Sequence, residues 1–373
     1  MHPEKASNHP AAITEGANLK RISLILAASL AVAPPPATAQ DPQARRHLNG
    51  HQAWVRAITA SADGRLWASA DDTGRIKIWD AATGHLRHTL EGPKGGITRL
   101  AFSPVDATLA AMSFMDQSVT LWDAGHGRLR HTLKHPRPLE TIAFSPDGQH
   151  LATGGWDNHA RLWHVATGQL RHQLGGHRHK ITDIAFSPDG RFIAVGSYAQ
   201  FGGNLKLWSV ANGRLMHTFA GHDARVHNIA YAPDGRSIAT GSSRGEVRLW
   251  DPRTGKRLRE LVGFELTPFQ RFLDDFEQQN RDKPRFEAQW DLMKRIQRDP
   301  ALKKMFDDAR TTHVEHDVTA LRFSPDGEFL AVGSQDRTVR IWRAATGQLL
   351  HTLVGHKAAV HLMVFVAGRS QII

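Results

Sequence analysis

Apolar and polar residues alternate with a period of two in the segment 318–356, in four short runs separated by turn-forming residues. Such alternation predicts half-buried β-strands. The first turn, at 324–327, reads Ser-Pro-Asp-Gly, in which proline presets φ and glycine accepts a positive φ. The segment therefore predicts a sheet of four antiparallel strands. Because such a sheet has apolar residues on both faces, it has to stack on further sheets to be stable in water.

The same pattern recurs along most of the chain. The Ser-Pro-Asp-Gly turn, or a variant of it, returns at intervals of 42 to 45 residues, apart from one interval of 92. Tryptophans at the end of the third predicted strand give a second marker with the same period: Trp79, Trp122, Trp163, Trp208, Trp250 and Trp342. Four strands in each period of about 40 to 45 residues are typical of a β-propeller.

Two dipeptides define the register of the repeats. Gly-His stands at 50–51, 176–177, 221–222 and 355–356, and Trp-Asp stands at 79–80, 122–123 and 250–251. Together with the turns, these motifs resemble the WD40 repeat family from about residue 44 to residue 373. The resemblance implies an all-β fold, a seven-bladed propeller over 40–373, with strands a to d in each blade from the axis outward.

The ends of the repeat array predict how the ring closes. Residues 44–48 take the place of an outer strand without a blade of its own, and residues 355–366 begin a seventh blade. The usual spacing would place the next tryptophan beyond Ile373, so this blade lacks its third strand. We expect six complete blades plus a partial seventh. A fragmentary sequence, a short seventh blade and completion by another chain remain open alternatives.

The interval of 92 residues contains one period and about 50 further residues, 263–312, with a different pattern. Apolar residues at 269, 272, 273 and 276 follow helical spacing, and Pro284 and Pro300 stand at positions typical of helix starts. We predict a helical insertion of two or three short amphipathic helices between blades five and six.

Residues 1–39 differ from the rest of the chain. Lys20 and Arg21 precede a twelve-residue apolar run at 22–33, and Ala-Thr-Ala follows at 37–39. This order is typical of a secretory signal peptide, with cleavage after Ala39; an apolar tail that is not removed is the alternative. The run is too short to span a bilayer, and no other segment is longer. We therefore expect a periplasmic or secreted protein with no membrane span.

Composition and charge add two constraints. The chain has no cysteine, which excludes disulfides and thiolate metal sites. Its net charge is +11, and +10 remains after residues 1–39 because that segment carries three basic and two acidic residues. A surface with this charge attracts anionic partners.

The resemblance also implies a hydrogen-bonded chain in each blade, formed by a histidine, a strand-b hydroxyl, a turn aspartate and the strand-c tryptophan. The histidines would be His51, His135, His177, His222 and His356, and the aspartates Asp116, Asp157 and Asp336. Asp72 is one residue out of register, and Gly202 and Arg244 replace the aspartate in two blades. Because the set recurs in successive blades, we interpret it as structural rather than catalytic.

No motif predicts an enzyme, a cofactor or a metal site. Gly-Ser-Ser-Arg-Gly at 241–245 has the letters of a nucleophile elbow, but it lies between two predicted strands instead of a strand and a helix. Histidines 88, 131, 172, 217 and 351 hold the same strand-d position in different blades, so they cannot converge on one ion.

Cationic residues in the loops from strand d to strand a, and large residues before the turn aspartate, should share one rim of the propeller. With the insert, they give the predicted partner-binding set: Lys94, Met115, Arg137, Trp156, Arg178, Lys180, Arg225, Gln335, Lys357, Phe272, Phe276 and Trp290. Ordinary solvated loops are the alternative. We predict a non-catalytic scaffold that binds a protein or an acidic polymer. A binder of nucleic acid or an anionic envelope polymer is the second hypothesis, and a propeller enzyme the third.

Overall fold

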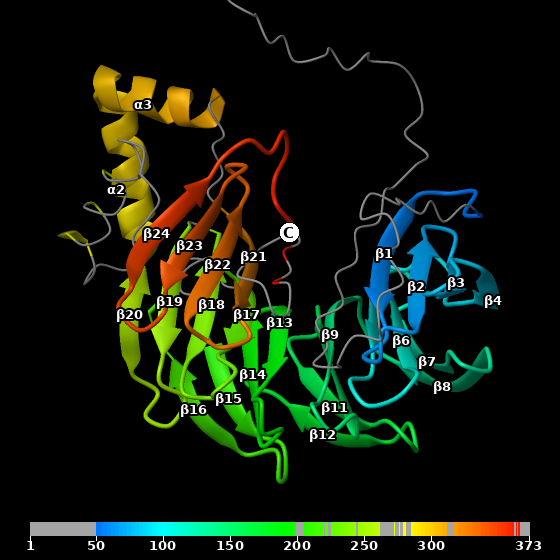
Figure 1. Ribbon diagram of the computed structural model, residues 1–373. Coiled ribbons are helices and arrows are strands. Elements are labelled where there is room, and N and C mark those ends of the chain that lie inside the picture. Colours follow the sequence, from blue (N-terminus) through cyan, green and yellow to red (C-terminus); the bar gives the residue numbers. More distant parts are fainter. Residues whose placement is uncertain are drawn as a thin grey trace, which may run out of the picture.

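Six four-stranded antiparallel sheets follow one another along the chain in the computed structural model (Figure 1). The structure describes residues 50–198, 205–219, 221–222, 225–243, 245–261, 285–311 and 317–361, with Phe272, Phe276, Gln279, Asn280, Met363 and Phe365. The predicted signal peptide 1–39 and closing strand 44–48 lie outside these residues.

The first three sheets have the strand order of the chain. Sheet one contains β1 (Val55–Ala60), β2 (Leu66–Asp71), β3 (Arg75–Asp80) and β4 (Leu86–Glu91). Sheet two contains β5 (Arg99–Phe102), β6 (Thr108–Ser113), β7 (Ser118–Asp123) and β8 (Arg128–Lys134). Sheet three contains β9 (Leu139–Phe144), β10 (His150–Gly155), β11 (Ala160–His164) and β12 (Leu170–Leu174).

The next three sheets repeat this order. Sheet four contains β13 (Ile181–Phe186), β14 (Phe192–Ser197), β15 (Leu205–Ser209) and β16 (Leu215–Phe219). Sheet five contains β17 (Val226–Tyr231), β18 (Ile238–Ser242), β19 (Val247–Trp250) and β20 (Arg257–Leu261). Sheet six contains β21 (Val318–Phe323), β22 (Phe329–Ser334), β23 (Val339–Arg343) and β24 (Gln348–Leu353). The predicted four-stranded repeat is confirmed in all six.

The sheets form an arc whose first strands line the inner side, because β1, β5, β9, β13, β17 and β21 each contact the next in turn (Figure 1). Sheets one and six stand at the two ends of the arc. The part of the chain that the structure describes does not join them, and it forms six four-stranded sheets. A closed ring of seven blades stays a prediction.

Val360 nevertheless adds to the array. Its amide donates to the Ser334 carbonyl at 3.3 Å, and its carbonyl accepts from Thr319 Oγ1 at 2.5 Å. Thr182 makes the same contact with Val226 two junctions earlier, between sheets four and five. Val360 and Met363 are buried against sheet six, so they take the place that a further strand a would take.

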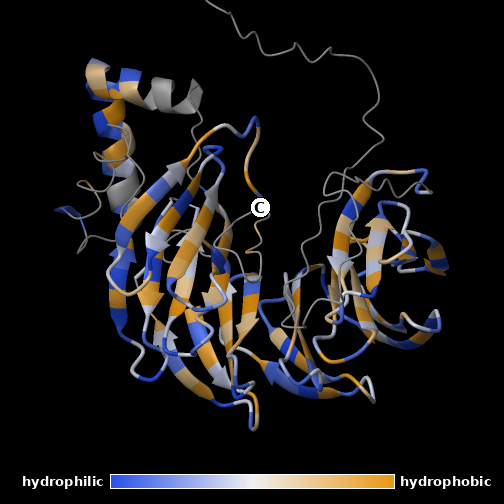
Figure 2. Cartoon of the chain, viewed as in Figure 1, coloured by the Kyte–Doolittle hydropathy of each residue, from blue (hydrophilic) through white to orange (hydrophobic). Residues whose placement is uncertain are grey.

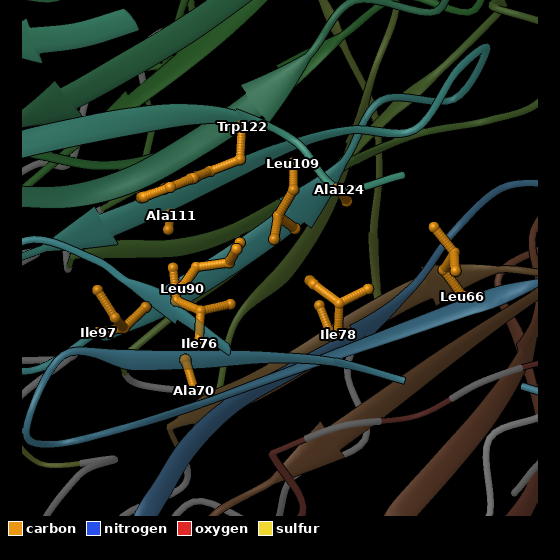
Figure 3. Packing of buried hydrophobic residues seen from close by; sticks show 11 residues of the cluster. Leu66, Ala70, Ile76, Ile78, Leu90, Ile97, Leu109, Ala111, Trp122 and Ala124 are labelled. Atoms are coloured by element: carbon orange, nitrogen blue, oxygen red, sulfur yellow. The ribbon is translucent and has the colours of Figure 1, made fainter. Parts of the chain in front are cut away.

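The hydrophobic core lies between sheets. In the first cluster, Ile76, Ile78 and Leu90 of sheet one pack against Leu109 and Trp122 of sheet two (Figure 3). Apolar and polar residues alternate along the strands, as Figure 2 shows. Full burial of one such aliphatic side chain contributes about 1.5–3 kcal/mol, so each sheet depends on its neighbour for stability.

The Ser-Pro-Asp-Gly turns are held by their own side chains. Ser324 Oγ donates to Asp326 Oδ1, and the same hydroxyl accepts the amide of Phe329 at 2.9 Å. Gly327 adopts φ 75°, a left-handed conformation that glycine takes without steric cost. The motif therefore fixes the end of strand a and the start of strand b.

The described residues 285–311, between β20 and β21 in the chain, form two helices inside the stretch where helices were predicted. They are α2 (Arg285–Arg298) and α3 (Pro300–Thr311). Asp299 caps α3, because its Oδ1 accepts the amides of Ala301 at 2.9 Å and Leu302 at 3.1 Å. Ile296 and Leu302 are buried against each other in a small core of their own.

Candidate functional site

The two ends of the array carry different connections. In an antiparallel sheet, the b–c turns and d–a loops lie at one end, and the a–b and c–d turns lie at the other. We call the first the rim end and the second the turn end. The predicted cationic loop residues and the predicted large residues all belong to connections of the rim end.

A repeated backbone hydrogen bond positions the side chains of the rim end. The residue that follows strand b donates its amide to a carbonyl just before strand a of the same sheet. The pairs are Asp72 with Trp54, Trp156 with Pro138, Tyr198 with Lys180, Ser243 with Arg225, and Gln335 with Asp317, at 2.8 to 3.0 Å. This contact places the side chain after strand b beside the loop that enters strand a.

Trp156 is the centre of a cluster that joins three sheets. Its Nε1 donates to Glu140 Oε1 at 2.7 Å, and Lys180 Nζ donates to the same oxygen at 2.6 Å. Lys180 Nζ also lies 4.6 Å from the centroid of the Trp156 ring, a cation–π contact. Phe114 of sheet two meets the indole edge-on at 5.8 Å. We call these four residues the Trp156 cluster.

A second aromatic–cation pair lies in the next sheet along. Arg225 Cζ is 4.3 Å from the centroid of the Tyr198 ring, and His179 meets that ring edge-on at 6.0 Å. Burial, together with Arg225 and Lys180, lowers the pKa of nearby His227 to about 4. His227 is therefore neutral at neutral pH, and the positive charge comes from Lys180 and Arg225.

The other predicted binding residues differ in how exposed their side chains are. Lys94, Arg137, Arg178 and Lys357 are exposed in their loops, and Met115 is 69% exposed, whereas Gln335 is half-buried. Trp290 is exposed on α2. Phe272 is half-buried and packs with the helices, and Phe276 is buried. Phe276 therefore offers little surface to a partner and Phe272 offers part of its ring, and the binding role of both stays a prediction.

The predicted structural chain is complete in sheet one. Trp79 Nε1 donates to Ser69 Oγ at 2.8 Å, and Ser69 Oγ lies 2.7 Å from His51 Nε2. His51 Nδ1 lies 2.7 Å from Asp71 Oδ2. The carboxylate is thus Asp71, where the sequence pointed to Asp72.

Sheet five builds the same chain with a different acid. Trp250 Nε1 donates to Thr240 Oγ1 at 2.7 Å, and His222 lies 2.6 Å from that oxygen and 2.9 Å from Glu246 Oε2. Glu246 supplies the carboxylate that we had expected to be lost at Arg244. Burial lowers the pKa of His222, while Glu246 opposes this effect.

Sheets three and four depart from the chain. Both ring nitrogens of buried His135 and His177 have no hydrogen-bond partner in the described structure. Asp157 pairs with Arg161, a cation on strand c, and Trp163 still donates to Thr153. Burial and Arg161 lower the pKa of His135 to about 4. Burial and Lys206 lower that of His177 to about 3.

The remaining predicted structural residues fall outside a complete chain. Trp122 donates to Thr120, two residues away on the same strand, and Asp116 accepts from Ser118. Asp336 pairs with Arg340 at 2.8 Å. The indole nitrogens of Trp208 and Trp342 are buried without a partner in the described part of the chain. His356 is exposed, so the structure gives it no role inside a core.

The strand-d histidines have a role that sequence reasoning missed. His88, His131, His172 and His217 each place Nε2 2.9 to 3.4 Å from a carbonyl in the c–d turn of the next sheet. Neighbouring sheets are therefore linked by side-chain hydrogen bonds as well as by their core. The spacing of these histidines, one in every repeat except the fifth, where Arg259 holds the position, was the available signal.

Glu140, Tyr198 and Phe114 were also missed at the rim end. Tyr198 and Phe114 directly follow strand b, as Trp156 does, and this shared position could have identified them.

Among the described residues, no three His, Asp or Glu side chains gather as a metal site would require. Gly241 and Ser242 end β18, and Gly245 precedes β19, so the described part of this motif lies between two strands. No helix within the described ranges is long and apolar enough to cross a bilayer.

Comparison with known proteins agrees with this architecture. The family model described as "WD domain, G-beta repeat" matches residues 42–80, 84–123, 127–164, 168–209, 213–251 and 309–343. These matches cover more than half of the chain. Five of them end at the last residue of a strand c, and the match 213–251 ends one residue after β19, which is also a strand c.

Three curated proteins illustrate the similarity. The chain is 33% identical to small ribosomal subunit protein RACK1 of Candida albicans over 126 residues, which are 32% of this chain and 39% of that protein. It is 26% identical to the periodic tryptophan protein 2 homolog of Dictyostelium discoideum over 138 residues, 36% of this chain and 15% of that protein. It is 24% identical to autophagy-related protein 16 of Arabidopsis thaliana over 137 residues, 37% of this chain and 27% of that protein.

The matched segments therefore span well under half the length of these relatives. Family membership rests instead on the six matched repeats. Each contains strands a to c of one sheet, and four of them begin with strand d of the sheet before. Proteins built from such repeats generally act as non-catalytic interaction scaffolds. The chain belongs to the WD40 repeat family.

Proposed function

We propose that this chain is a non-catalytic scaffold that binds a protein partner at its rim end, with the Trp156 cluster at the centre of the contact. The observation that supports this most directly is the state of Trp156. The indole is 49% exposed although its nitrogen, its face and its edge all have partners. A large aromatic side chain held in one orientation loses little conformational entropy on binding.

The residues around Trp156 fit this role. Trp, Tyr and Arg are the side chains that most often dominate the energy of protein interfaces. Trp156, Tyr198 and Arg225 lie on sheets three, four and five of the rim end, in consecutive repeats. A partner that covers Trp156 and Tyr198 would exclude water from two cation–π contacts, which strengthens them.

The test compares two tryptophans of the same end. Trp156→Ala should lower the amount of bound partner protein captured from cell extract by about tenfold, as loss of a central interface residue does. Trp54→Ala is the matched control, because Trp54 is 70% exposed before β1 and lies outside the cluster. If capture is equal for the wild type and both variants, the Trp156 cluster is not the binding site.

Charge favours a second candidate, an anionic polymer. The net charge of +11 and the exposed Lys94, Arg137 and Arg178 would attract one. Heparin is a suitable probe. Its affinity should fall steeply between low and physiological salt, because salt screens contacts between exposed charges. Affinity that does not change with salt would argue against this candidate.

We also propose that the protein is exported, on the support of the sequence order at 1–39. The mature chain would then begin at Gln40. Mass spectrometry of the protein from its source cells should find this N-terminus outside the cytoplasm, and an intact Met1 on cytoplasmic protein would contradict export.

A further inference from the structure

Two adjoining cavities lie at the turn end, opposite the rim end. One, of about 740 Å³, lies where sheets three and four meet, and the other, of about 710 Å³, lies between sheets four and five. They share Asp189, Phe192 and Met216, so together they form one elongated depression, which we call the turn-end groove. Each half has the volume of an ordinary ligand site.

Tyr231 gives the second cavity an unusual polar group. It ends β17, and the residue that ends strand a is Phe102, Phe144, Phe186 or Phe323 in four other sheets. The hydroxyl of Tyr231 is buried, and no described residue hydrogen-bonds to it. Burial and the charge of Asp189 raise the pKa of this phenol, so it stays protonated. A buried donor of this kind needs an acceptor.

The walls around Tyr231 are apolar. Pro188 and Pro233 come from the Ser-Pro-Asp-Gly turn of sheet four and the matching Ala-Pro-Asp-Gly turn of sheet five, and both line the cavity with Leu207 and Met216. Leu207 is buried, whereas Met216 is 47% exposed at the part shared by both cavities. These side chains form an apolar pocket that can hold one aliphatic or aromatic group.

Five arginines and three aspartates line the groove, so its lining carries a net positive charge. Arg191 and Arg214 line the first cavity, both are exposed, and no described carboxylate lies within salt-bridge distance of either guanidinium. Asp189, whose Oδ1 accepts from the Ser187 hydroxyl and from the Arg191 amide, offsets part of the charge of Arg191, and the two cations lower the pKa of no further described carboxylate in the first cavity. Arg236 and Arg253 line the second cavity and are paired with Asp234 at 3.9 Å and Asp251 at 3.4 Å, so Arg191 and Arg214 supply the unpaired positive charge among the described lining residues.

We propose that the turn-end groove binds an extended, acidic peptide segment of a partner protein. An apolar side chain of the segment sits between Pro188 and Pro233, a peptide carbonyl or a carboxylate accepts from Tyr231, and acidic side chains face Arg191 and Arg214. The groove crosses from sheet three to sheet five, which suits an extended chain better than a compact ligand. Because the rim end is opposite, the scaffold could hold two proteins at once.

The test begins with selection of peptides. A random twelve-residue peptide library displayed on phage is panned on the whole chain, and the enriched sequences are synthesised and titrated by fluorescence anisotropy. The expected consensus has one aliphatic or aromatic residue flanked by Asp or Glu. Failure to enrich any sequence, or a neutral or basic consensus, would overturn the proposal.

Three variants locate the binding. Tyr231→Phe should weaken the selected peptide about tenfold, while thermal stability stays equal or rises, since Phe already ends strand a in four sheets. Arg191→Glu combined with Arg214→Glu should weaken it at least as much. Arg65→Glu is the matched control, since Arg65 follows the glycine of the same turn in sheet one and is exposed.

Two outcomes would exclude the groove even if peptides bind. Equal affinity for the wild type, Tyr231→Phe and the double arginine variant would place the peptide elsewhere. If the arginine variants instead change the oligomeric state measured by light scattering, the occupant is a second copy of this chain. Trp156→Ala should not affect peptide binding, so failure of the rim-end proposal and failure of this one can be told apart.

Discussion

At the scale of single residues, the carboxylate near strand c pairs with a histidine in sheets one and five and with an arginine in sheets three and six. Asp71 accepts from His51 in sheet one, whereas Asp157 pairs with Arg161 in sheet three and leaves His135 without a hydrogen bond. Because a neutral histidine without partners is buried more cheaply than a charged one, His135 stays unprotonated far below its usual range.

This difference predicts a loss of stability in acid. The folded-state pKa of His135 is about 4 against an ordinary 6.5, so below pH 6.5 the unfolded chain takes up a proton that the folded chain refuses. Between pH 7.5 and 4.5 this one group should cost roughly 2–3 kcal/mol of unfolding free energy. His135→Phe keeps an aromatic ring against Trp163 and should lose less stability over that range in urea titrations. An equal loss in the variant and the wild type would contradict this origin.

The residue scale is also where the sequence was least informative. The turn aspartates were placed by counting back from each tryptophan, which assumes a b–c turn of constant length. Asp71 lies two residues further from its tryptophan than Asp157 does, and Glu246 reaches His222 from the residue before strand c with a longer side chain. The sequence identifies the type of group required but not the residue that reaches the histidine.

At the scale of elements, neighbouring sheets are joined by the strand-d histidines. His131 Nε2 lies 3.0 Å from the carbonyl of Ala166 in the next sheet, and its ring lies close to Gly168, where a Cβ would meet it at 2.7 Å. The glycine of the c–d turn therefore serves two purposes. It allows φ 67°, and it leaves room for the histidine of the preceding sheet.

His131→Ala should lower unfolding free energy by about 1 kcal/mol, the usual value of one hydrogen bond between protein groups. His351→Ala is the matched control, since His351 holds the same position in β24 but is exposed, with no further four-stranded sheet beside it among the described residues. Urea titrations of both variants give the comparison. If both variants lose the same unfolding free energy, the contact with Ala166 does not stabilise the fold, and the loss reflects the weaker strand preference of alanine.

At the scale of the whole molecule, the repeat period determined the sheets, their strand order and the place of the helices. Periodicity carries this information because every repeat must bury the same faces against its neighbours. It carries less about closure, which depends on a single junction rather than on a repeated one. Closure by residues 44–48 therefore stays a prediction. On the side of sheet six that faces away from sheet five, Val360 forms hydrogen bonds with Ser334 and Thr319.

Sheet six should depend on this added segment for part of its stability. Val360 is 7% exposed and packs with Ala320, Ala331 and Val339, so Val360→Ala should cost about 1–2 kcal/mol through lost burial and the cavity left behind. Val354→Ala removes the same atoms from a site that is 77% exposed and should change unfolding free energy by less than about 0.5 kcal/mol. Both values come from urea titration of the whole chain. If the two variants are equally stable, the residues after β24 do not pack on sheet six, and the folded array ends with that sheet.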